Sequence, residues 1–86
     1  MKLDVKAMAI TIGLVWGILV MFAVGVANLI WPNYGQAFLD VMASIYSGYK
    51  ATPSFGQILI GTTYGLVDGA IAGAIFAWIY NRFAKD

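Results

Sequence analysis

The chain has 86 residues, of which 62% are apolar and only 10% are charged, and its formal net charge is +1. A water-soluble domain carries roughly 25% charged residues, and a domain this small has little interior in which to bury so much apolar surface. The composition therefore excludes an ordinary soluble domain. It predicts an integral membrane protein whose first partner is the lipid bilayer.

The missing residue types exclude several kinds of chemistry. The sequence has no Cys and no His, which excludes zinc fingers, iron–sulfur clusters, disulfide frameworks and catalysis by Cys or His. A net charge of +1 supplies no basic patch for nucleic acid. No base or metal-binding set stands at a catalytic spacing. We therefore expect no enzyme activity, no catalytic residues, no metal and no cofactor.

Two apolar stretches dominate the chain. Residues 7–31 carry no charge, and residues 55–80 carry one, Asp68. Each stretch is longer than the roughly 20 residues that a helix needs to cross the hydrocarbon core. The sequence predicts one membrane domain, residues 1–86, with transmembrane helices at about 7–31 and 55–80. The first stretch exceeds the 7–15 residues of a signal-peptide core, so we expect it to be retained.

The connector, residues 32–54, contains a second type of pattern. Gln36, Asp40, Ser44 and Ser47 recur at helical spacing, which leaves an apolar side opposite them. This spacing predicts a short amphipathic helix lying flat in the outer headgroup region, with Ser54 as the N-cap of the second long helix. The predicted fold is an all-α membrane protein, a hairpin of two transmembrane helices joined by a short amphipathic interfacial helix.

The distribution of Lys and Arg predicts the orientation of this hairpin. Basic residues lie at the two chain ends, before the first apolar stretch and after the second, whereas the connector carries only Lys50. Cytoplasmic loops carry the excess of Lys and Arg, so both termini are expected in the cytoplasm, with the chain crossing the inner (cytoplasmic) membrane twice. Aromatic residues near both ends of the helices fit interfacial belts: Trp31, Tyr34, Tyr46 and Tyr49 outside, and Trp78, Tyr80 and Phe83 inside.

Glycines recur every fourth residue in the second apolar stretch, at Gly61, Gly65, Gly69 and Gly73. We call these four residues the glycine stripe. Helices in lipid associate through close backbone packing, which glycine allows because it has no side chain to hold them apart. The first apolar stretch has a weaker counterpart that includes Gly13 and Gly17. Either the two sets pack against each other inside one hairpin, or one set serves the hairpin and the other an oligomer.

Asp68 is the only charge inside an apolar stretch. A charge at the bilayer centre costs at least about 2.5–3.5 kcal/mol. Asp68 comes three residues after Gly65, which puts it within about 60° of that glycine round the helix and predicts that it faces the helix contact. In an antiparallel hairpin Trp16 lies at the same depth, so its indole N–H is the expected donor to Asp68. Asn28 and Gln57 form a second expected pair. Three roles for Asp68 remain open: an interhelical hydrogen bond, the lining of a pore or ion path, and contact with a bound partner, pigment, lipid or larger subunit.

Taken over nearly its full length, the chain resembles a family of small bacterial two-helix membrane proteins labelled bacteriophage holin or holin-like. The resemblance rests on Gly13-Leu14-Val15-Trp16-Gly17, on Ile45-Tyr46-Ser47-Gly48-Tyr49-Lys50, on Val67-Asp68-Gly69 and on Ala77-Trp78-Ile79-Tyr80-Asn81. It implies a membrane protein that packs through its glycines into a homo-oligomer and can form a pore. The alternative is an accessory subunit bound to a larger membrane protein complex.

Overall fold

The computed structural model describes residues 2–84 and is helical, without strands in that range. The elements in chain order are the α-helix α1 (Val5–Leu14), the π-helix η1 (Val15–Phe22), α2 (Ala23–Ile30), α3 (Gln36–Ile45) and α4 (Phe55–Phe83). The first three form one continuous helix, Val5–Ile30. This helix and α4 are both long and apolar enough to cross a membrane, with mean hydropathies of 2.4 and 1.5. The predicted helical class and the two long apolar helices are confirmed.

The ends of the long helices differ from the predicted ones for local reasons. The first begins earlier, at Val5, because the Asp4 side chain accepts hydrogen bonds from the backbone N–H groups of Lys6 and Ala7, at 3.0 and 3.3 Å. Such an N-cap satisfies donors that the first turn leaves free. Ser54 occupies the N-cap position of α4 as expected, but its side chain makes no capping bond.

The first long helix changes its hydrogen-bond pattern in the middle. Over the eight residues of η1 the backbone is π-helical, and the N–H of Ala23 closes the segment on the carbonyl of Ile18. π-helical turns are rare and often mark functional sites. The apolar pattern did not predict this widened segment, which carries Trp16 and Met21.

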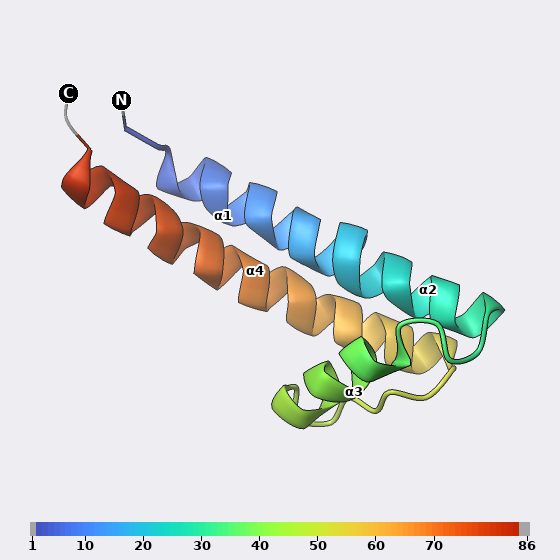
Figure 1. Cartoon of the computed structure of the whole chain (residues 1–86). Coiled ribbons are helices and arrows are strands. Elements are labelled where there is room, and N and C mark those ends of the chain that lie inside the picture. The colour runs from blue at the N-terminus through green and yellow to red at the C-terminus, as the bar shows by residue number, and fades with distance from the viewer. Residues whose placement is uncertain (1, 85–86) are drawn as a thin grey trace.

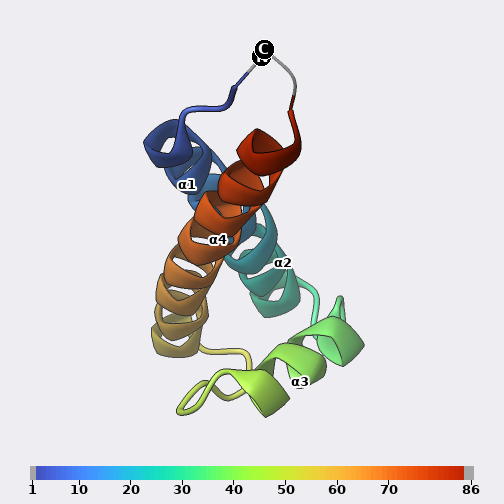
Figure 2. The same ribbon diagram turned by 90° about the vertical axis from the view of Figure 1, so that its left-hand side faces the viewer.

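The two long helices run antiparallel and cross each other, so that the two ends of the chain meet at one end of an elongated molecule of 49 × 21 × 19 Å (Figures 1 and 2). We call them the helix pair. Asn81 joins the chain ends: its side chain accepts from the Leu3 N–H at 2.6 Å and donates to the Leu3 carbonyl at 2.7 Å. The Lys2 ammonium donates to the Asn81 carbonyl at 2.5 Å, in the last turn of α4, where a cation is favoured.

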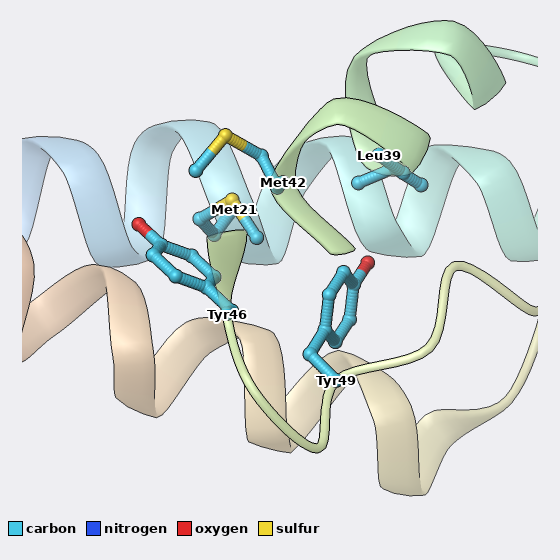
Figure 3. Packing of buried hydrophobic residues seen from close by; sticks show 5 residues of the cluster. All are labelled: Met21, Leu39, Met42, Tyr46 and Tyr49. Atoms are coloured by element: carbon cyan, nitrogen blue, oxygen red, sulfur yellow. The ribbon is translucent and has the colours of Figure 1, made fainter. Parts of the chain in front are cut away.

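The connector folds back onto the helix pair. Asn33 and Gly35 have positive φ angles of 79° and 66°, and this turn directs α3 back along the side of the pair instead of beyond its end (Figure 1). The apolar side of α3 and the residues after it then bury a cluster against the first long helix, shown in Figure 3: Met21, Leu39, Met42, Tyr46 and Tyr49. A helix lying apart in a headgroup layer would leave these side chains without such a cluster.

Candidate functional site

The glycine stripe and its counterpart pack against each other within one chain. A β-carbon at Gly65 would lie 2.9 Å from the Gly17 Cα, and one at Gly69 would lie 2.9 Å from the Gly13 Cα. Gly73 lies against the carbonyl of Met8. Real side chains would not fit at these distances, so the two backbones are in direct contact at three of the four glycines of the stripe. Of the two arrangements left open by the sequence, the structure has the one inside a single chain.

Gly61, the remaining member of the stripe, has a different neighbour. A β-carbon there would lie 2.9 Å from the ring of Tyr49 and 3.1 Å from the Met21 side chain. The outermost glycine therefore makes room for the connector and not for the backbone of the first helix. The stripe is fully used in binding other parts of the same chain.

A line of three polar groups crosses from the first helix to α4. The Trp16 indole N–H donates to the Tyr46 hydroxyl at 2.8 Å, and the Tyr46 hydroxyl donates to Asp68 Oδ2 at 2.8 Å. The predicted direct bond from Trp16 to Asp68 is therefore wrong, because the connector places the Tyr46 hydroxyl between them. We call these three residues the polar triad. It joins the connector to both long helices.

The surroundings of Tyr46 keep its hydroxyl group in place. Its ring stacks on Tyr64 with centroids 4.8 Å apart and 7° between planes, and the Trp16 ring meets Phe38 edge-on at 6.0 Å. Burial raises the pKa of Tyr46, and the Asp68 charge raises it further, against the lowering by the Trp16 bond. The hydroxyl is thus held protonated, as a donor to Asp68 must be. Tyr46 and Tyr49 were expected in an outer aromatic belt, yet both are buried, being 4% and 7% exposed.

Asp68 does not face the helix contact as predicted, because its side chain is exposed at the edge of that contact. The reason is geometric. A residue every four positions advances about 40° round the helix at each step, so the contact line has moved towards Gly69 at this level. Asp68 lies about 100° away from Gly69. After accepting the bond from Tyr46, the carboxylate still has an open side.

Asn28 and Gln57 do not pair with each other as predicted; each bonds to the connector. The buried Asn28 amide donates to the Tyr34 carbonyl at 2.9 Å and to Gln36 Oε1 at 3.1 Å. Gln57 Oε1 accepts from the Lys50 N–H at 2.8 Å. Irregular backbone must find hydrogen-bond partners, and the two amides supply them where the connector leaves and rejoins the helix pair.

Sequence reasoning missed Gln36 and the central place of Tyr46. The Gln36 amide donates to the Ala51 carbonyl at 2.7 Å and to Asp40 Oδ1 at 2.9 Å, so it holds the start of α3 to the end of the connector. The helical spacing had assigned Gln36 to a solvated polar side. The signal available for Tyr46 was its place on the apolar side of the amphipathic pattern, which is the side that a folded-back connector buries.

Within residues 2–84 no three His, Cys, Asp or Glu side chains gather as ligands for a metal. Comparisons with protein-family models, with curated proteins and with solved structures find no match for this chain. The features of the molecule that bear on its function are the glycine-packed helix pair, the polar triad and the open side of Asp68.

Proposed function

We propose that the chain is a small integral membrane protein that crosses the inner membrane twice and self-associates, in the manner of the holin-like family that it resembles. The observation that carries the proposal is Asp68. It lies near the middle of a 29-residue apolar helix and is still exposed after bonding to Tyr46. Ionisable groups at this depth face the interior of a helix bundle or a water-filled cavity. A single copy offers Asp68 neither, so a further subunit is needed to cover it.

Several features support insertion of the helix pair into a bilayer. The exposed side chains along both helices are large and apolar, among them Leu19, Val67 and Phe76. The two chain ends meet at one end of the molecule (Figure 1). The basic residues Lys2, Lys6 and Arg82 lie close to the chain ends in the sequence. With the positive-inside rule, this favours cytoplasmic termini and an outward-facing connector.

The backbone contact between the two long helices also bears on a pore. Gly13 and Gly17 lie directly against Gly69 and Gly65, which leaves no path for an ion through a single copy. A pore of this protein would therefore form between copies. The open side of Asp68 would supply the polar group in its lining.

The test is a blue-native gel of gently solubilised membranes, followed by the same gel on the purified chain in nanodiscs. Self-association predicts a multimer of this chain alone in both samples. An accessory subunit would instead migrate with other proteins in the first sample and as a single copy in the second. That result would replace the proposed function by the alternative, and a single copy in both samples would contradict each of them.

A further inference from the structure

One face of the chain stays polar and irregular after the helices have packed. After α3 the backbone turns at Ser47 and Gly48, both exposed, and Gly48 has a φ of 85° with nothing within 4 Å of a β-carbon. Asp40, Lys50 and Asp68 are exposed as well, and Asp68 is joined to the residue before the turn because the Tyr46 hydroxyl donates to it. We call Ser47, Gly48, Asp40, Lys50 and Asp68 the connector face. Gln36 ties the face together by its bonds to Asp40 and to the carbonyl of Ala51.

The Ser47–Gly48 turn and Asp68, the inner part of the connector face, lie too deep in the membrane to be left to lipid. The 29 residues of α4 span about 43 Å at 1.5 Å per residue, against roughly 30 Å of hydrocarbon core. In a centred helix the core therefore begins about four residues inside each end. Tyr64 lies beyond that boundary, and its hydroxyl donates to the carbonyl of Ser47. Irregular backbone at such a depth occurs where protein or water covers it and not against lipid.

We propose that the connector face is the surface through which two copies of this chain meet, related by a two-fold axis. The proposal rests on the self-association argued above and adds the surface involved. The glycine stripe is not free for this purpose, since Gly65, Gly69 and Gly73 already contact the first helix. A second copy covers the Ser47–Gly48 turn and the open side of Asp68 in one contact.

The charges of the connector face fit a second copy. Asp40 and Lys50 have opposite charges and both are exposed. The Gln36 amide links the Asp40 carboxylate to the carbonyl of Ala51, the residue after Lys50. In a two-fold contact each patch meets its own copy, so that residue i faces j and j faces i. Lys50 of one copy then faces Asp40 of the other, twice over. The patch is complementary to itself.

Single-cysteine cross-linking in native membranes tests this surface, because the chain has no cysteine of its own. Ser47→Cys places a thiol on the connector face. Ile18→Cys is the matched control. Ile18 is 39% exposed and lies in the first long helix, on roughly the opposite side from Trp16, which contacts the connector. After oxidation by copper phenanthroline, Ser47→Cys should give at least about fivefold more disulfide-linked dimer than Ile18→Cys.

Equal or greater cross-linking of Ile18→Cys overturns the assignment of the surface. A multimer on the blue-native gel without cross-linking of Ser47→Cys overturns it too, and leaves self-association standing. A charge exchange provides an independent measurement. Lys50→Asp should reduce the dimer fraction several-fold, and Lys50→Asp combined with Asp40→Lys should restore it. If the double variant is as weak as the single one, the two charges do not meet across the interface.

Discussion

Gly65→Ala adds one methyl group at the point where the two long helices touch. Its β-carbon would lie 2.8 Å from the Met21 Cγ and 2.9 Å from the Gly17 Cα, whereas carbon atoms in good contact are about 3.5–4.0 Å apart. Met21 can move, but the Gly17 backbone cannot. The helices must therefore separate by about 0.6–1 Å at this level, which is enough to lose a quarter to a half of the local dispersion energy.

Overpacking of this kind costs about 1–3 kcal/mol, and we expect Gly65→Ala to lower the free energy of unfolding by that amount and Gly65→Leu by more. The matched control is Gly56→Ala in the first turn of α4. There a β-carbon meets only the Ser54 hydroxyl, at 3.7 Å, and the higher helix propensity of Ala predicts no loss or a gain of up to about 1 kcal/mol. Unfolding by SDS in mixed micelles, followed by circular dichroism, measures both.

Equal stability of Gly65→Ala and the unaltered chain would refute direct backbone contact between the two helices. A second control is a change at Leu59, which is 47% exposed, to another large apolar residue. Leu66 cannot serve as one. Its side chain packs against Gly17, where a β-carbon would lie 2.6 Å from the Leu66 Cγ.

Three further predictions concern the polar triad and the orientation. Tyr46→Phe should lower the free energy of unfolding by about 1 kcal/mol, because it removes two hydrogen bonds worth about 0.6 kcal/mol each on average; unchanged stability in the same SDS titration would mean that the triad contributes nothing. Asp68→Asn should preserve assembly on blue-native gels and Asp68→Leu should weaken it; if Asp68→Asn leaves the oligomer intact and yet abolishes proton movement into vesicles loaded with a pH-sensitive dye, the carboxylate has a transport role. Impermeant thiol reagents added to intact cells should label a cysteine at Asn33 and not at Lys2 or Arg82, and any other pattern contradicts cytoplasmic termini.

The long helices and their contact could be predicted from the sequence because one physical rule governs each. A charge-free run longer than the bilayer core has few alternatives to a long helix, and glycine every fourth residue marks the side where backbones approach. The spacing of Gly13 and Gly17 thus identified positions that the structure places against Gly69 and Gly65.

The hydrogen-bond partners could not be predicted in the same way. Matching residues by depth treats the two long helices as the whole molecule, so it joined Trp16 to Asp68 and Asn28 to Gln57. A third segment changes the result. Once the connector folds back, the Tyr46 hydroxyl lies between Trp16 and Asp68. Backbone groups of the connector likewise bond to Asn28 and to Gln57.

The fold-back of the connector is the central claim, since the polar triad and the connector face both depend on it. Nuclear Overhauser contacts of the Tyr46 ring, measured by NMR on the purified chain in nanodiscs, test it directly. We expect cross-peaks from the Tyr46 ring to the indole N–H of Trp16 and to the ring of Tyr64, which stacks on it. A Tyr46 ring with cross-peaks only to its chain neighbours and to lipid would contradict the account.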